Sequence, residues 1–568
     1  MNFSPIDGLR MLAVETGLLI AFTLLAFLVL HFLRPPLSRP RWLDGIVRQE
    51  WRAMLLIIAI ALAGRALLMP WLGIPQPHIN DEYSYLLMGD TFSHFRLANP
   101  TPAAWQHFET FHVNLLPTYH SKYPVAQGLA LALGEIVFHQ PWMGICLTTA
   151  LLCGAICWTL MAFVPAEWAL LGGLLAAVKL AFFSYWMNSY WGGSITALGG
   201  ALALGAVVRL FDPTQSERRG ALLAWIFALA LLFLATSRPF EGLAFAIPLL
   251  VYFAYKLVRG VTRSELKLLS TVLPLVIVGV AGLGLMARYN QRTTGNAFLM
   301  PYALYERTYA SLPLFFGQRV TPPQTAHDPV FPKYYVVEAE EHDYQEGKPL
   351  SGIVGLEVRR VWNDWFFYVG PALSFPLLIG LLLCIKQRGL RLVLAVTVTT
   401  GAAVASCIFS QAHYFAPATV AVYVFAMAGL HYLWQQGGDG ERAFAVAVCL
   451  TVIVASLTRN TGSSTLNTAS AFPNTRKIVA RQLADRPGKH LILVSYDMQR
   501  HYPGDELVHN GAEFGAEKIL WARSKGTAND SDLCQAYSGR TFWSVTTDDV
   551  QFSLRPLDLC GSEPAAQR

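Results

Sequence analysis

Two adjacent carboxylates, Asp81 and Glu82, are the residues of this chain best suited to chemistry. They lie in the segment His78-Ile-Asn-Asp-Glu-Tyr83, which follows a hydrophobic run from Trp51 to Gly73 and opens a long polar stretch. A positioned carboxylate can act as a general base, because it accepts the proton that an attacking hydroxyl loses. We expect Asp81 to be such a base, with Glu82 or His78 orienting it or its substrate. Taken alone, the pair could also cap a helix, since acids favour helix N-termini.

Cationic and aromatic groups lie in three other short segments. Ser121-Lys-Tyr-Pro-Val125 closes the polar stretch, Thr236-Ser-Arg-Pro-Phe-Glu241 separates two apolar runs, and Gln411-Ala-His-Tyr-Phe-Ala-Pro417 opens a late one. Arginine and lysine stabilise phosphate oxygens, arginine through a bidentate fork. We therefore expect substrate or phosphate binding by His78, Lys122, Tyr123, Arg238, His413 and Tyr414. A single interfacial lysine could instead contact anionic lipid.

The elements that must position these groups are membrane helices. The 568 residues are 54% hydrophobic and 14% charged, whereas soluble domains carry about 25% charged residues. Several apolar runs reach the length of about 20 residues that crosses a bilayer. We expect an α-helical polytopic membrane protein with about twelve spanning helices, near 11–33, 53–72, 142–163, 166–187, 192–210, 220–237, 239–257, 269–288, 361–385, 389–409, 412–434 and 442–458.

The distribution of basic residues predicts the topology. Lysine and arginine gather in short turns within 34–52, 209–219, 256–267 and 386–391, which the positive-inside rule places in the cytoplasm. Both termini are then external, as are loops 73–141 and 289–360, the turn near 188–191 and the tail 459–568. The apolar piece Val125 to Phe138 is too short to span, so we expect a helix along the membrane surface. The net charge of the chain is +6, and its lysine and arginine residues cluster in these turns rather than on a nucleic-acid-binding surface.

The pattern of the chain predicts three parts. Residues 1–50 form an additional N-terminal transmembrane helix with a basic cytoplasmic loop, 51–458 form the transmembrane catalytic module, and 459–568 form a small external α/β domain. In that domain we expect a helix over 475–483 and strands at 490–495, 518–522 and 541–546. Cys534 and Cys560 could form a disulfide if the tail is outside the cytoplasm. Asp530-Ser-Asp532 resembles a metal-binding motif, but we expect an exposed turn.

The order of these motifs resembles that of the GT-C superfamily of polytopic glycosyltransferases. Matching segments are Asp81-Glu82 in the first external loop, Lys122-Tyr-Pro124, Arg238-Pro239 before an apolar helix, and the helix start at 413–417. The resemblance covers roughly residues 50–435 and is nearest to bacterial protein O-mannosyltransferases and aminoarabinose (lipid A) transferases. Val125 replaces the usual second proline, and Arg238-Pro239 stands where relatives often have Lys-Gly. These departures leave donor and acceptor open.

The resemblance implies transfer of one sugar from a polyprenyl-phosphate-linked donor to an envelope glycan, lipid or protein. The site would face the periplasm from a bacterial inner membrane, and one-step attack would invert the anomeric carbon. We expect no cofactor and no metal, since no DxD motif lies in the core loops. The alternatives are a lipid-linked substrate transporter or flippase, a non-catalytic envelope assembly protein, and an envelope oligosaccharide ligase or polymerase.

Overall fold

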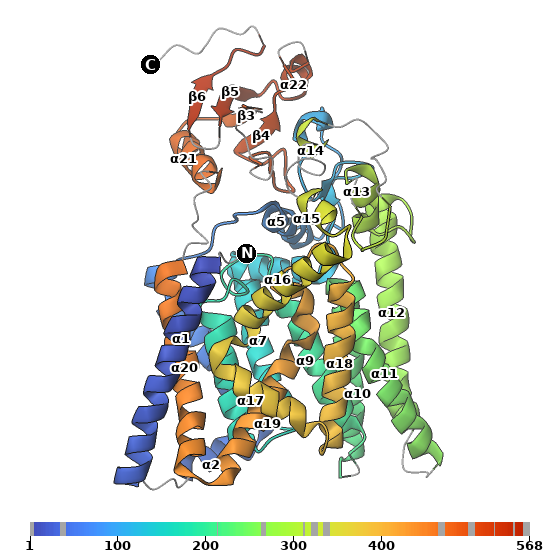
Figure 1. Cartoon of the computed structure of the whole chain (residues 1–568). Helices are drawn as coiled ribbons and strands as arrows, with labels where there is room; N and C mark the ends of the chain where they lie inside the picture. Colours follow the sequence, from blue (N-terminus) through green and yellow to red (C-terminus); the bar gives the residue numbers. More distant parts are fainter. Residues whose placement is uncertain are drawn as a thin grey trace.

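The computed structural model describes residues 5–34, 41–212, 214–262, 268–310, 313–319, 328–332, 341–463, 472–497, 506–526, 529–548 and 551–560. It shows a bundle of long helices with a smaller mixed α/β tail standing on one end (Figure 1). The N-terminus lies at the same end of the bundle as the tail, in agreement with the expected topology.

The bundle is built from the long apolar helices of the chain. Its elements are α1 (Pro5–Leu28), η1 (Val29–Leu33), α2 (Arg41–Val47), α3 (Glu50–Leu67), α4 (Met69–Leu72), α7 (Trp142–Leu160), α8 (Ala166–Ala176), η3 (Ala177–Phe182), α9 (Ser194–Leu210), α10 (Glu217–Ser237), α11 (Pro239–Thr262), α12 (Leu268–Thr294), α16 (Leu350–Tyr368), α17 (Gly370–Leu383), α18 (Arg388–Ala405), η5 (Ala412–Ala418), α19 (Thr419–Gln436) and α20 (Asp439–Ser463).

Within the described residues, eight helices are long and apolar enough to cross a membrane, or nine if α16 and α17 together form one bent span. All eight coincide with predicted spans, but the predicted number of about twelve is larger. The predicted span 53–72 is α3, which carries Glu50, Arg52 and Arg65. The spans 166–187 and 192–210 are the short α8, continued by a π-helix, and the 17-residue α9.

The predicted span near 361–385 consists of two helices rather than one, because α16 and α17 meet at an angle of 97°. Gly370 lies at the bend with a φ of +66°, a left-handed conformation that favours glycine, and Pro371 follows it. Helix α16 begins at Leu350, so part of the predicted external loop 289–360 is helical. That loop also holds α13 (Pro301–Thr308), α14 (Val330–Pro332) and α15 (Glu341–Glu346).

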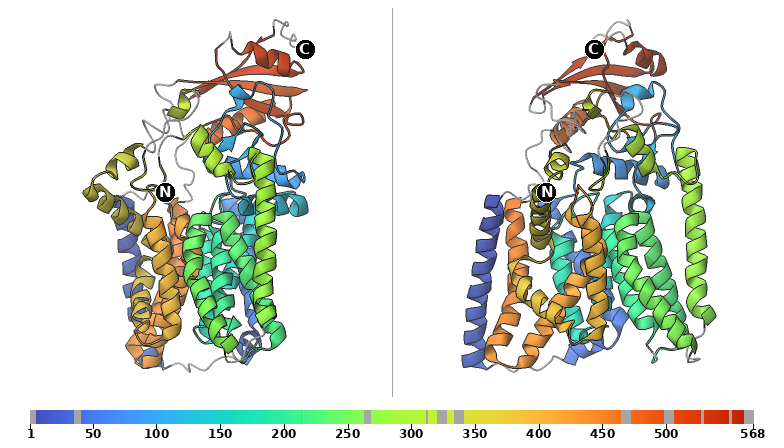
Figure 2. Two further views of the ribbon diagram at one scale, coloured as in Figure 1. Left: turned by 90° about the vertical axis from the view of Figure 1, so that its right-hand side faces the viewer. Right: turned by 45° about the vertical axis from the view of Figure 1, so that its right-hand side comes forward.

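Two helices position the Asp81 segment between the bundle and the tail. Helix α5 (Asn80–Ser93) starts at the acidic pair and packs on α6 (Val125–Phe138). Helix α6 has the bounds expected for a surface helix and packs in turn on α7. Between them, the loop forms a short helix η2 (Trp105–Phe108) and paired strands β1 (Val113–Asn114) and β2 (His120–Ser121). Figures 1 and 2 show α5 above the bundle and below the tail.

The tail has the predicted α/β character. Its sheet has the order β4-β3-β5-β6, with β3 (Lys489–Tyr496) parallel to β4 (Ile519–Arg523) and β5 (Arg540–Thr547), and β6 (Phe552–Pro556) antiparallel. Helices α21 (Phe472–Ala484) and α22 (Ser531–Ala536) flank it. Cys534 and Cys560 form a disulfide. The expected exposed turn at Asp530 is wrong, because this side chain is buried and binds Ser524 and the amide of Lys525.

Candidate active site

Asp81 lies in the first turn of α5 with part of its carboxylate open to solvent. The side chain is 29% exposed, and the Tyr123 hydroxyl donates a hydrogen bond of 2.5 Å to its Oδ1 atom. Burial and the neighbouring Asp81 charge raise the pKa of Tyr123, so its hydroxyl stays protonated and donates. Within the described part of the chain, no lysine or arginine pairs with Asp81, so no cation neutralises its carboxylate directly.

His112 is a member of this site that the sequence did not indicate. Its Nε2 atom lies 3.8 Å from Oδ2 of Asp81, too far for a direct hydrogen bond. Burial, followed by the Lys122 charge, lowers the pKa of His112 to about 3, although Asp81 opposes this shift. The imidazole is thus neutral at physiological pH, and it contributes a polar group beside Asp81 without neutralising the carboxylate.

Lys122 lies on the other side of His112. Its ammonium is 3.2 Å from Oε1 of Glu306 and stands 4.5 Å and 4.8 Å from the ring centres of Tyr305 and Tyr302. All three partners come from α13, in the second external loop. An ammonium over aromatic faces is stabilised by their quadrupoles, so α13 fixes a positive charge near Asp81. The sequence predicted Lys122 but none of the α13 residues.

Arg238 supplies a second positive charge from the junction of α10 and α11. Its guanidinium donates to Glu241 Oε1 at 2.9 Å and lies 4.2 Å from the ring centre of Tyr414. Tyr414 is held near this junction because η5 packs closely on α9. A Cβ atom on Gly200 would come within 1.9 Å of the Pro417 carbonyl oxygen, so only glycine permits this approach.

Tyr85 connects the carboxylate and the guanidinium. Its ring stacks on Tyr123 with centres 4.4 Å apart. Burial raises the pKa of Tyr85, the Arg238 charge opposes this rise, and the charges of Asp81 and Glu241 add to it. Tyr85 therefore lies within the fields of both Asp81 and Arg238. Three segments that are distant in sequence thus converge on one site, as the motif pattern predicted.

Glu82 has a different environment from that of its neighbour. It is buried and accepts hydrogen bonds from the backbone amides of His78 at 2.6 Å, Ile79 at 3.3 Å and Tyr190 at 2.8 Å. Burial raises the pKa of Glu82 to about 7 against these amide donors. Glu82 therefore caps the start of α5 and holds the 184–191 segment against it. The alternative that the acidic pair caps a helix thus applies to Glu82.

The two predicted histidines contribute less directly. His413 is buried, accepts or donates a hydrogen bond of 3.1 Å with the Tyr185 hydroxyl, and lies 4.6 Å from the ring centre of Trp191. It fixes η5 against the aromatic segment 184–191. His78 enters the site through its backbone amide, which binds Glu82. Substrate binding by His413 and by His78 stays a prediction.

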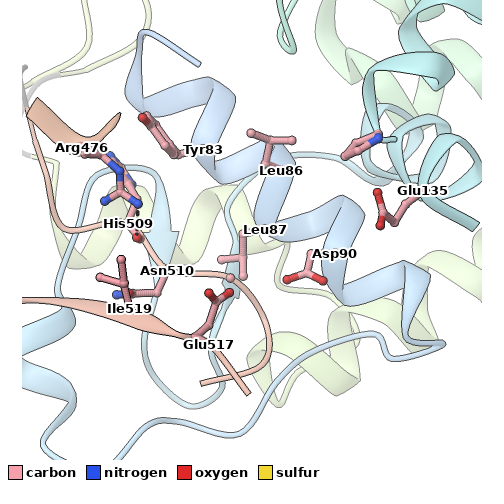
Figure 3. A pocket seen from close by; sticks show the side chains of 12 residues that line it. Tyr83, Leu86, Leu87, Asp90, Glu135, Arg476, His509, Asn510, Glu517 and Ile519 are labelled. Atoms are coloured by element: carbon pink, nitrogen blue, oxygen red, sulfur yellow. Dashed lines mark hydrogen bonds between the residues drawn. The ribbon is translucent and has the colours of Figure 1, made fainter. Parts of the chain in front are cut away.

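The tail docks directly on α5. His509 Nε2 lies 3.0 Å from Oδ1 of Asn80, which precedes Asp81, and the His509 ring stacks on Tyr83 at 4.1 Å. Asp90 accepts a hydrogen bond of 2.6 Å from the amide of Ala512. A cavity of about 320 Å³ lies within this contact. Figure 3 shows Tyr83, Leu87 and Asp90 of α5 facing the tail residues Arg476, His509, Asn510, Glu517 and Ile519.

The sequence predicted that no metal is needed, and this stays a prediction. In the described ranges, no group of three or more His, Cys, Asp or Glu side chains is arranged to hold a metal ion. Asp532 belongs to the tail segment that resembles a metal-binding motif. Its carboxylate lies 3.0 Å from Nε2 of the buried His107. That contact helps to hold the first external loop to the tail.

Comparison with known proteins gives structural neighbours only. No protein-family model and no curated protein matches the chain. Among solved structures, it is similar to ArnT from Cupriavidus metallidurans bound to undecaprenyl phosphate, with 12% identity and a TM-score of 0.49 over 89% of this chain and 94% of that one. It is also similar to the Archaeoglobus fulgidus oligosaccharyltransferase in complex with Zn and sulfate, with 12% identity and a TM-score of 0.47 over 87% and 67%.

A third structure, of AglB from Archaeoglobus fulgidus with an inhibitory peptide and a dolichol-phosphate, has 10% identity and a TM-score of 0.36 over 88% of this chain and 69% of that one. The identities to these three structures are 10–12%. Their TM-scores lie below 0.5. The functional assignment therefore depends on the residues of this chain.

Proposed function

We propose that this protein is a GT-C type membrane glycosyltransferase that transfers one sugar from a polyprenyl-phosphate-linked donor to an envelope acceptor. One observation carries the proposal: an accessible carboxylate, Asp81, without a cationic partner in the described residues, stands near two fixed cations, Lys122 and Arg238. Such a site can remove a proton at one point and stabilise a phosphate at another.

The proposed reaction is a single displacement at the anomeric carbon. The acceptor hydroxyl forms the new C–O bond while Asp81 takes its proton. The bond from the anomeric carbon to the phosphate oxygen breaks, and its electron pair stays on the lipid phosphate. The transition state has oxocarbenium character, as in glycoside hydrolysis, and attack opposite the leaving group inverts the configuration.

The leaving phosphate needs charge stabilisation more than protonation. Arg238 is the stronger candidate, because its fork matches phosphate oxygens and its side chain is 20% exposed. Lys122 is 7% exposed and lies against the rings of Tyr302 and Tyr305. It therefore stabilises the phosphate through its electric field rather than by direct contact. Fixed charges that face a developing negative charge lower the barrier without reorganisation. No metal takes part in this scheme, and EDTA should leave the rate unchanged.

The membrane setting supports a site on the external face. The described chain holds eight candidate spans, and α5, whose first turn contains Asp81, lies on the same side of the bundle as the tail (Figure 1). The Cys534–Cys560 disulfide is typical of an oxidising compartment. We therefore propose a bacterial inner membrane with the active site open to the periplasm, where a polyprenyl-phosphate donor and an envelope acceptor can meet.

The first test is mass spectrometry of envelope glycans and glycolipids from cells that lack the protein, rescued with wild type or with Asp81→Asn at equal protein levels. We expect the loss of one sugar increment, which only wild type restores. Full rescue by Asp81→Asn would refute the general base. Loss of a long glycan, rather than one sugar, would identify a ligase or polymerase instead.

A further inference from the structure

A second, larger cavity lies apart from the Asp81 site. It has a volume of about 1120 Å³ and forms where three segments meet. The tail contributes residues 494–496 and 523–525, the first external loop contributes residues from 105–117, and the second contributes α13 with Asp328 and Pro329. The volume lies at or above the usual range of about 300–1,000 Å³ for ligand sites, so the cavity can hold more than one sugar ring.

The position of this cavity in the tail sheet is one where ligands commonly bind. Residues 494–496 end β3 and residues 523–525 end and follow β4, and these two neighbouring strands run parallel. In open α/β sheets, ligands bind outside the carboxyl ends of parallel strands. Here the two external loops cover this edge and form the opposite wall of the cavity.

The chemistry of the wall fits a ring that carries hydroxyl groups. Trp105, Tyr309 and Tyr496 supply aromatic surface, which packs against apolar ring faces. In the described part of the protein, the side chains of Trp105, Gln106 and Ser495 have no hydrogen-bond partner and so keep free an indole N–H, an amide and a hydroxyl. Uncharged donors and acceptors of this kind match sugar hydroxyls.

The charges at this cavity are already paired with one another. Arg523 lies 3.0 Å from Asp328 and also binds Glu506, and Lys525 lies 3.9 Å from Glu109. Arg523 is held by two carboxylates and is only 4% exposed, so it is less able to contact a phosphate than Arg238, which has one carboxylate partner and is 20% exposed. The tail strands β3 and β4, which contribute to the wall of the cavity, stand away from the bundle (Figure 1). An uncharged ligand fits this wall better than a lipid phosphate does.

One helix, α13, contributes residues both to the cavity and to the surroundings of Lys122 in the Asp81 site. Helix α13 presents Tyr305 and Glu306 to Lys122 and presents Leu304 and Thr308 to the cavity, within about one helical turn of 5.4 Å. Asn114 also lines the cavity, two residues after His112 of the Asp81 site. A ligand in the cavity would thus lie next to the Asp81 site.

We propose that this cavity binds the saccharide portion of the acceptor, an uncharged oligosaccharide, while its terminal hydroxyl reaches Asp81. The inference rests on the proposed function, since it names the acceptor class of that same site. It makes the tail and α13 an acceptor-binding unit, and it leaves the donor to the membrane side of the centre.

The test measures oligosaccharide binding to the full-length protein in lipid nanodiscs, with fluorescently labelled oligosaccharides released by mild acid from the envelope of the native host. We expect one uncharged size fraction to bind. Trp105→Ala should weaken its affinity roughly tenfold through lost stacking, and Gln106→Ala should weaken it several-fold. Trp71→Ala is the matched control, because this exposed tryptophan lies on α4. Its binding should equal that of wild type.

Several outcomes would overturn the inference. These are no binding by any fraction, equal binding by wild type and both cavity variants, or binding that protease treatment of the fraction abolishes and periodate does not. Gln106 is exposed, so Gln106→Ala keeps the test valid if Trp105→Ala lowers the melting temperature. The proposed function is tested separately, by whether cells that lack the protein lose a sugar increment that wild type restores. If wild type restores the increment but no fraction binds, only the cavity assignment fails.

Discussion

Two charged clusters of this protein use the same residue types to different ends. At the tail junction, the buried Glu506 carboxylate binds Arg523, the Tyr496 hydroxyl and the amide of Val508. At the centre, Asp81 has a tyrosine hydroxyl and a neutral imidazole beside it. The first carboxylate is fully compensated and closed to solvent, whereas the second is partly open to solvent and has no cationic partner in the described residues.

The difference shows where the chain keeps charge available for chemistry. A buried ion pair that loses one partner leaves an uncompensated charge, so such pairs hold structure together. In the centre, Lys122 and Arg238 are paired with Glu306 and Glu241 rather than with Asp81. This pairing keeps the cations in place without neutralising the base. Substitutions in the two clusters should therefore separate activity from stability.

The largest expected effect is that of Asp81→Asn on the transfer rate. The amide keeps the shape of the side chain but cannot accept the proton, so we expect kcat to fall by about 10³-fold. The melting temperature should stay close to that of wild type, because Asp81 is partly exposed and has no cationic partner in the described residues. The measurement is single-turnover transfer from a defined polyprenyl-phosphate sugar. A loss below tenfold would remove Asp81 from the role of base.

Glu506→Gln should show the opposite behaviour. Among the described residues, it leaves the buried Arg523 with one carboxylate partner, Asp328, and we expect a loss of about 3 kcal/mol in the free energy that holds the tail together. Limited proteolysis of the tail reports this loss. Glu513→Gln is the control, since its pair with Arg96 is partly exposed and should contribute less than about 1 kcal/mol. Equal protease resistance of the two variants would contradict the comparison.

Arg238→Met should reduce kcat/KM for the donor by about 10²-fold, because a group that stabilises the leaving phosphate is lost. Arg238→Lys keeps the charge but not the fork, so we expect an intermediate value. Arg219→Met is a matched control, as this arginine is 46% exposed at the opposite end of α10 and pairs with Glu50. If Arg238→Met and Arg219→Met have equal kcat/KM, Arg238 is not a phosphate ligand.

Tyr123→Phe should lower kcat by about tenfold, since one hydrogen bond to a charged group is removed. The affinity for the donor should change little, because the Tyr123 hydroxyl contacts Asp81 and not a cation. Tyr119→Phe removes a hydroxyl that binds the Asn510 carbonyl and serves as the control. A larger fall with Tyr119→Phe than with Tyr123→Phe would place the sensitive contact at the tail.

The sequence predicted much of this arrangement because its signals are local. Long apolar runs predicted the eight spans, and short apolar runs predicted the three parallel strands of the tail. The motifs at 81, 122, 238 and 413–414 were found from residue type and their position after a span. The bend before α17 was missed, although Gly370-Pro371 is a local signal for it.

Other parts of the site depend on tertiary contacts that a single sequence does not encode visibly. His112 and Glu306 are separated by nearly two hundred positions, and only the packing of α13 on β1 brings their segments together. Asp81 and Glu82 are indistinguishable in a pattern of residue types. Their roles differ because successive side chains on a helix point in different directions, one toward Tyr123 and the other toward backbone amides.

The smallest expected effect concerns Glu82, the neighbour of the proposed base Asp81. Its pKa of about 7 in the folded protein lies above the ordinary value of 4.5, because it is buried. The stabilisation from its protonated form is therefore complete below pH 4.5 and is lost as the pH rises through about 7. We expect the wild-type melting temperature to fall by a few degrees across this window and that of Glu82→Gln to fall less. Parallel melting curves for the two proteins between these pH values would show that Glu82 is ionised throughout, with its amide donors outweighing burial.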